Sequence, residues 1–192
     1  MQTQWKQLVL AIALASALLP ASAQSAEIDP ALLAKANTGD PAAQVQVGES
    51  YAAGNGVTRD LNQAAEWYRK AAGKKDLSAE LHLAALYRDG GKGFPRDPVQ
   101  SAAWYRKAAE QGDATAQATL GLLYSLGQGV AKSDVEAYFW LDLAASAKGP
   151  KQQQYAQNRQ LIGTHITTDE LEEVQERIAK WKAAHPRTSG PE

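Results

Sequence analysis

Histidine is the first residue type to examine for chemistry, and the chain contains three, His82, His165 and His185. None of them forms an H-x-x-x-H or H-E-x-x-H pattern, which would place two metal ligands on one face of a helix. The chain has no cysteine, which excludes a thiolate ligand, a cysteine nucleophile and a disulfide framework. We therefore predict no metal site, no cofactor and no catalytic residue, and we expect the histidines to lie at the surface.

Two further features raise the question of phosphate or acid–base chemistry. Gly-x-Gly occurs once in each unit, at residues 54–56, 91–93 and 127–129. A phosphate loop follows a strand, and no strand pattern is present. A turn in which glycine adopts a positive φ explains this motif. Asp60, Asp97 and Asp134 recur after the turns, and their carboxylates are predicted to cap helices. The chain contains no Gly-x-Ser-x-Gly or Ser-x-x-Lys nucleophile motif.

Basic residues are paired at 69–70 and again at 106–107, which raises the question of nucleic-acid binding. The corresponding third position carries Asp142 and Leu143, and the formal net charge of the chain is −1. Nucleic-acid binding requires a sustained basic surface, which this pattern does not provide. We predict a solvated face and no nucleic-acid partner.

The elements that must position these residues repeat along the chain. Two aspartates, a tyrosine and a tryptophan recur at spacings of 36 or 37 residues, as Asp40, Asp76 and Asp113; Tyr51, Tyr87 and Tyr124; Asp60, Asp97 and Asp134; and Trp67, Trp104 and Trp140. Apolar residues at helical spacing on both sides of each glycine turn predict two helices per unit. One unit cannot bury its apolar face alone, so the units must stack. We predict an all-α fold, an α-solenoid of about three helix–turn–helix repeats with helical caps.

The period also predicts the organisation of the chain. The expected segments are an N-terminal capping helix at 24–39, repeats at 40–75, 76–112 and 113–149, C-terminal capping helices at 150–185 and a tail at 186–192. Thr167 and Glu170 have the spacing of a capping box, which predicts that the last helix begins there. On its charged face, Glu173 and Arg177 are predicted to pair at i, i+4.

Residues 1–23 have the three regions of a cleaved signal peptide. Lys6 supplies a positive start, residues 8–19 form an apolar run, and Ala21-Ser22-Ala23 provides the small residues before a cleavage site. As a helix, the apolar run would rise only about 18 Å, which is shorter than the roughly 30 Å of a bilayer core. We expect cleavage after Ala23, a periplasmic or secreted product, and no membrane contact after cleavage.

The repeated unit resembles the Sel-one-like repeat (SLR) family, which is related to the tetratricopeptide repeat. The family pattern A-x-x-x-L-G-x-x-Y-x-x-G-x-G-V, followed by D-x-x-x-A-x-x-W-x-x-x-A-A, is similar to residues 116–130 and 134–145, with one-residue shifts at the turn. The second unit departs most, with Ala84 in place of the glycine and Phe94-Pro95 in place of the valine. The resemblance implies a right-handed α-solenoid that acts as an interaction adaptor, often in envelope assembly, signalling or host contact.

The repeating residues are explained by capping, turning or packing, so the variable positions of the first helices become the binding candidates. In stacked helical arrays these positions line the concave face. We name them the first-helix stripe, which consists of Gln46, Glu49, Ala53, His82, Ala85, Asp89, Thr119, Leu122 and Leu126. We predict that the stripe binds a protein or peptide, and that Leu122 and Leu126, if exposed, anchor it. The alternative, slightly favoured by the sequence, is that both leucines pack under the C-terminal cap.

Two other functions stay open at this point. One is an envelope hydrolase acting on cell-wall or β-lactam substrates, which rests on family analogy alone. The members linked to such activity are rich in cysteine, and the present chain has none. The other is self-association through an incompletely capped end of the array.

Overall fold

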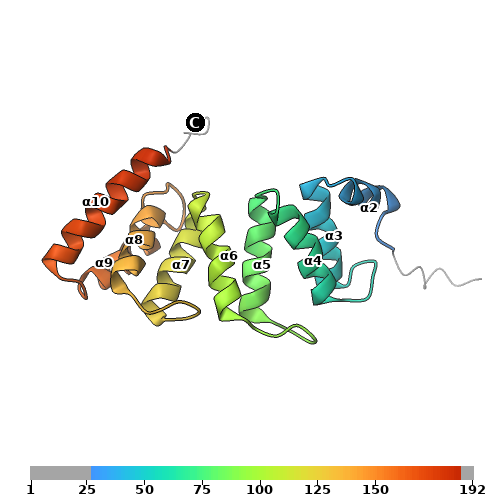
Figure 1. Ribbon diagram of the computed structural model, residues 1–192, viewed down its shortest axis with the longest axis horizontal. Coiled ribbons are helices and arrows are strands. Elements are labelled where there is room, and N and C mark those ends of the chain that lie inside the picture. Colours follow the sequence, from blue (N-terminus) through green and yellow to red (C-terminus); the bar gives the residue numbers. More distant parts are fainter. Residues whose placement is uncertain (1–26, 187–192) are drawn as a thin grey trace, which may run out of the picture.

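The computed structural model describes residues 27–186, whose regular structure is helical (Figure 1). The helices are α2 (Pro30–Asn37), α3 (Pro41–Ala53), α4 (Leu61–Ala72), α5 (Leu77–Asp89), α6 (Pro98–Glu110), α7 (Ala114–Leu126), α8 (Asp134–Ala145), α9 (Gln152–Gly163) and α10 (Thr168–Ala184). Within 27–186, β pairing is limited to an isolated bridge between Gly91 and Phe94. The predicted all-α fold is confirmed. The predicted signal peptide, and residues 187–192 of the predicted tail, lie outside the described residues.

The helices follow one another in chain order along the molecule, with α2 at one end and α10 at the other (Figure 1). Helices pair within each unit as α3 with α4, α5 with α6, and α7 with α8. The units join through α4 with α5 and through α6 with α7, and both α9 and α10 pack on α8. This nearest-neighbour packing is the architecture of an α-solenoid. None of the helices formed by residues 27–186 is long and apolar enough to cross a membrane.

Aspartate side chains begin most of these helices by accepting hydrogen bonds from otherwise unpaired backbone N–H groups. Asp60 and Asp97 cap α4 and α6, as predicted. The first helices of the three units are capped in the same way by Asp40, Asp76 and Asp113. The prediction for Asp134 is wrong, because the hydroxyl of Ser133 caps α8 by accepting from the Glu136 N–H at 3.2 Å. Asp134 is instead the first residue of α8, where its charge still favours the positive end of the helix dipole.

Glycine ends the first helices, as predicted. Gly54 and Gly127 have φ values of 80° and 67° and follow α3 and α7. Gly129, in the turn between α7 and α8, lies against the first residues of α6. A Cβ atom at Gly129 would approach the Pro98 carbonyl oxygen to 1.9 Å, so glycine at this position allows the third unit to dock on the second.

Small residues bring the paired helices close together, and large rings fill the remaining space. A Cβ atom at Gly121 of α7 would lie 2.8 Å from the Leu141 side chain of α8. The four tryptophans among the described residues take packing positions, with Trp67 and Trp140 buried and Trp104 and Trp181 partly buried. The packing role predicted for the repeating tryptophans is confirmed.

The C-terminal cap is held by apolar and charged contacts. Val174 and Ile178 of α10 are buried in the same core cluster as α7 and α8. Thr167 and Glu170 form the predicted capping box at the start of α10. Arg177 pairs with Glu136 of α8 at 2.7 Å and not with Glu173, because the guanidinium turns toward the helix that α10 covers.

One position of the second helices is basic in the first two units and acidic in the third, next to the C-terminal cap. Arg69 and Arg106 occupy equivalent places in the first two units, and Asp142 occupies that place in the third. The carboxylate of Asp142 accepts hydrogen bonds from Arg159 of α9 at 2.7 Å and from Lys182 of α10 at 2.8 Å. A carboxylate at this position therefore ties both capping helices to α8.

Candidate binding surface

The first-helix stripe draws its residues from α3, α5 and α7. Six of its nine members are exposed, and these are Gln46, Glu49, Ala53, Asp89, Leu122 and Leu126. The other three, His82, Ala85 and Thr119, are partly buried. Contacts between neighbouring helices explain part of this difference.

Glu49 and His82 connect two of the helices. The Nε2 atom of His82 lies 3.1 Å from Oε1 of Glu49, which brings α3 and α5 together on this face. The His82 ring also stacks on the Tyr68 ring, with centroids 4.8 Å apart and planes 8° from parallel. Burial, aided by the negative charge of Glu49, raises the pKa of Tyr68 to about 12. The sequence led us to expect His82 at the surface, whereas the structure shows it partly buried, with its ring between an aromatic and an acidic neighbour.

Asp89 ends the α5 part of the stripe in a fixed charge cluster. The Nε and Nη2 atoms of Arg88 donate to the two carboxylate oxygens of Asp89 at 2.8 and 2.9 Å. The same guanidinium donates to the Tyr105 hydroxyl of α6 at 2.8 Å. These hydrogen bonds from Arg88 hold the pKa of Asp89 below its ordinary value. The middle of the stripe thus carries an ionised carboxylate whose charge is already shared with an arginine.

The α7 part of the stripe is apolar and open. Leu122 and Leu126 are 41% and 64% exposed, which overturns the expectation that they pack under the C-terminal cap. The cap reaches the other end of α7, where the Tyr155 hydroxyl of α9 lies 3.4 Å from that of Thr115. Leu122 lies seven residues further along the helix, or about 10 Å at the rise of an α-helix. The capping helices pack on α8 instead and leave these leucines uncovered.

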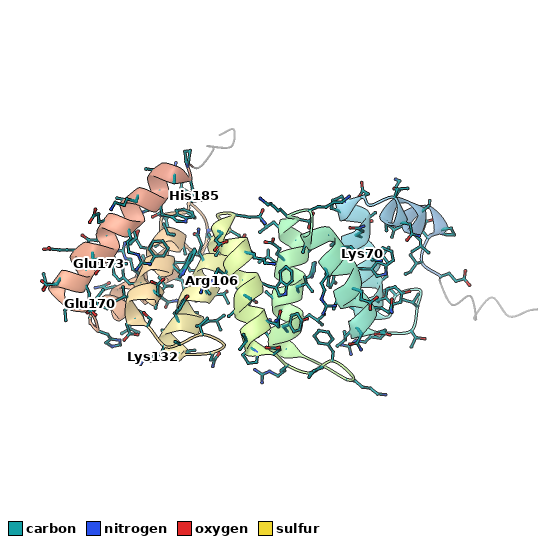
Figure 2. All side chains as sticks on the ribbon, viewed as in Figure 1. Lys70, Arg106, Lys132, Glu170, Glu173 and His185 are labelled. Atoms are coloured by element: carbon teal, nitrogen blue, oxygen red, sulfur yellow. The ribbon has the colours of Figure 1, made fainter. Side chains whose placement is uncertain are left out.

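In each pair of basic residues, the arginine connects neighbouring units and the lysine contacts its own helix. Arg69 donates to the Tyr87 hydroxyl of the next unit at 2.6 Å, and Arg106 donates to that of Tyr124. Lys70 and Lys107 each place their ammonium 3.7 Å from the centroid of a tryptophan ring of their own helix. Figure 2 shows Lys70 toward one end of the molecule and Arg106 nearer its middle. The spacing of 18 residues between arginine and tyrosine recurs in the sequence and could have revealed these contacts.

The remaining charged groups were compared with the requirements of a metal site in the part of the chain that the structure describes. Within residues 27–186 there is no group of three or more histidine and carboxylate side chains that could hold a metal ion. A groove of about 510 Å³ between α8, α9 and α10 contains Asp142, Arg159 and Lys182. Burial opposes the ionisation of Asp142, but hydrogen bonds from Lys182 and Arg159 outweigh it and lower the pKa of this carboxyl. The charges in the groove therefore satisfy one another.

Comparison with known proteins agrees with this architecture. The family model described as the Sel1 repeat matches residues 41–76, 77–113 and 114–148. The crystal structure of a Sel1 repeat protein from Oxalobacter formigenes is similar at 34% identity and a TM-score of 0.58, covering 67% of this chain and 96% of that protein. No match was found among the curated proteins.

A second similar structure is c5321, a protective antigen present in uropathogenic Escherichia coli strains that displays an SLR fold. It is 29% identical, with a TM-score of 0.66, and the match covers 84% of this chain but 36% of that protein. The present chain therefore corresponds to about a third of that longer protein.

Proposed function

Because the chain belongs to the Sel1 repeat family, whose repeats generally mediate protein–protein interaction, we propose that it is a non-catalytic adaptor that binds a protein or peptide through the first-helix stripe. The repeating residues are engaged in caps, turns and contacts between units. The stripe consists of positions of the first helices that vary from one unit to the next. It offers polar groups on α3 and α5 and an apolar end on α7.

One observation carries this proposal, the exposure of Leu122 and Leu126. The two side chains lie four residues apart and so on the same face of α7. No residue of α7 is charged, which leaves these leucines without a charged neighbour on their own helix. Apolar side chains in such a position provide an anchor for an apolar residue of a partner, and burying one contributes about 1.5–3 kcal/mol.

We place this activity in the cell envelope or the secreted space, on the basis of the signal-peptide pattern in residues 1–23. The N-terminal residue of the protein recovered from cells tests this part of the proposal. A mature protein that begins at Gln24 and is found outside the cytoplasm agrees with it. An intact N-terminus in the cytoplasm contradicts it.

The binding surface is tested by matched substitutions. Leu161 of α9 is 63% exposed and lies off the stripe, so Leu161→Ser is the control for Leu126→Ser, whose parent residue is 64% exposed. A photo-crosslinking residue at Gln46 of each variant would capture partners from envelope extract, and titration with the captured partner would give its affinity. We expect Leu122→Ser and Leu126→Ser to weaken binding by roughly tenfold or more each, as for a hot-spot residue.

The result with Leu161→Ser decides how a loss is interpreted. Equal weakening by Leu161→Ser and Leu126→Ser would show a general effect of removing exposed apolar groups and would contradict a role for the stripe. Unchanged affinity in both stripe variants would have the same consequence. The enzyme alternative has its own test, since hydrolysis of a cell-wall or β-lactam substrate above the buffer rate by purified protein would support it.

A further inference from the structure

A glutamine clamp recurs where a first helix meets the end of the preceding second helix. Gln44 of α3 donates through Nε2 to the carbonyl oxygen of Ala36 at 3.0 Å. Where the third unit meets the second, Gln117 of α7 donates through Nε2 to the carbonyl oxygen of Ala109 of α6 at 3.1 Å. Both glutamines are buried, so each clamp is shielded from competing water.

The joint between the first two units has a glutamate in this place. Glu80 lies 36 residues after Gln44 and 37 before Gln117, and the carbonyl at the corresponding position is that of Ala72. The carbonyl oxygen of Ala72 accepts a hydrogen bond from the Lys75 N–H at 2.9 Å. In the same way, the carbonyl oxygen of Ala36 accepts a hydrogen bond from the Gly39 N–H at 3.0 Å. The acceptor of the clamp is therefore present, but an ionised carboxylate has no proton to donate to it.

The surroundings of Glu80 favour its protonated form. The residue is only 3% exposed, and its carboxyl accepts a hydrogen bond from Gln111 at 2.8 Å. Burial raises the pKa of Glu80 above its ordinary value of 4.5, against the opposing effects of the Gln111 hydrogen bond and the Lys107 charge. Glu110 of α6 and Asp76 at the start of α5 raise it further.

Three basic residues of α4 and of the turn after it, Arg69, Lys70 and Lys74, are engaged elsewhere. Arg69 bonds the Tyr87 hydroxyl, and Lys70 lies over its own tryptophan. Lys74 donates to the carbonyl of Gly39. His82 lies two residues after Glu80, on another face of α5, and contacts Glu49 of α3.

We propose that Glu80 is a proton-operated latch between the first and second units. As a carboxylic acid, it donates its proton to the Ala72 carbonyl and reproduces the glutamine clamp of the other two joints. As a carboxylate, it releases that carbonyl and leaves a buried charge, so the joint between α4 and α5 opens more readily. The latch thus couples the spacing of α3 and α5, and with it the shape of the stripe, to pH.

The sign of the effect follows from the raised pKa. A group whose pKa is higher in the closed joint than in the open joint stabilises the closed joint fully below its ordinary pKa. This stabilisation is lost as the pH rises through the raised value. Acidification toward pH 4.5 should therefore tighten the joint.

Hydrogen exchange corrected for the intrinsic pH dependence tests the latch in the full chain. We would compare the parent, Glu80→Gln, His82→Gln and Gln117→Glu at about pH 4.5 and about pH 8. Each unit by which the pKa of residue 80 differs between the closed and the open joint changes the opening equilibrium by roughly tenfold. In the parent and in His82→Gln, residues 71–79 should become more protected at the lower pH. In Glu80→Gln the high protection should persist at both pH values.

Gln117→Glu provides a gain-of-function control, because it places a glutamate in the same slot one joint further along. Residues 108–116 should then acquire a pH dependence that the parent lacks at that joint. A pH dependence of residues 71–79 in Glu80→Gln equal to that of the parent would overturn the latch. So would a carboxyl ¹³C titration that places the pKa of Glu80 at or below its ordinary value.

Discussion

Lys75 holds a backbone conformation that glycine holds at the same place in the flanking units. Its φ is 61°, whereas the φ values of Gly39 and Gly112 are 94° and 91°. The left-handed conformation costs a residue with a Cβ atom about 1–2 kcal/mol relative to glycine. Glycine loses more backbone entropy on folding, which offsets part of this difference. Lys75 therefore stores strain at the joint that also contains Glu80.

We expect Lys75→Gly to raise the free energy of unfolding by about 1 kcal/mol, because relief of the positive φ outweighs the larger entropy of the unfolded chain. The reciprocal variant Gly112→Lys should lower it by about the same amount. A Cβ atom at Gly112 would have no other atom within 4 Å, so this variant isolates the backbone effect. Urea unfolding of the parent and both variants measures the difference. A loss of stability in Lys75→Gly would mean that the lysine side chain stabilises the fold by more than its positive φ destabilises it.

The exposure of single residues could be predicted from the sequence only in part. Leu122 and Leu126 were recognised as variable and apolar, but the sequence could not decide whether they were covered. That outcome depends on where α9 and α10 pack, which is set by contacts such as those made by Asp142, far from both leucines in sequence. The stacking of His82 on Tyr68 has the same origin, since it joins residues of two different units.

At the scale of the helices, most boundaries could be predicted because each has a local chemical signal. An aspartate supplies the cap, and a glycine supplies the positive φ that ends a first helix. The prediction at α8 was wrong by one residue because both Ser133 and Asp134 can cap a helix, and the period alone selected the aspartate. Caps that compete at adjacent positions are resolved by the geometry of the preceding turn, which the sequence does not provide.

The attachment of α10 depends on the carboxylate of Asp142. We expect Asp142→Asn to loosen α10 by roughly 1–2 kcal/mol, because Arg159 and Lys182 lose a shared partner but remain partly exposed to water. Hydrogen exchange of residues 168–184 measures the loosening. Glu176→Gln is the matched control, since its pair with Lys180 is 68% and 73% exposed and should contribute little. Equal exchange in both variants would show that the pairs made by Asp142 contribute nothing to the attachment of α10.

At the scale of the whole molecule, the contacts between neighbouring units stabilise the array, and these contacts differ in residue composition from one joint to the next. Each unit contacts its neighbours only, so a change at one joint is expected to remain local. Figure 2 shows Glu170 and Glu173 on α10, at the opposite end of the molecule from Lys70 on α4. The cap and the joint between the first two units are thus separate structural features with different titrating groups.

These two features should respond to acid in opposite directions. The raised pKa of Glu80 means that the α4–α5 joint tightens as the pH falls toward 4.5. The pKa values of Asp142 and Glu170 are lowered by their hydrogen bonds, so the stabilisation they give α10 is present above their ordinary values of 3.8 and 4.5. It is lost as the pH falls through the lowered values.

Hydrogen exchange of the parent from neutral to acid pH measures both responses in one sample, with residues 71–79 reporting the joint and residues 168–184 reporting the cap. We expect protection of the joint to rise first and protection of α10 to fall at lower pH, each changing by about tenfold per unit of pKa difference. Because nearest-neighbour packing keeps the two regions independent, one can tighten while the other loosens. Protection that rose or fell together in both regions would instead indicate a single cooperative unit and would contradict the division of the array into separate joints.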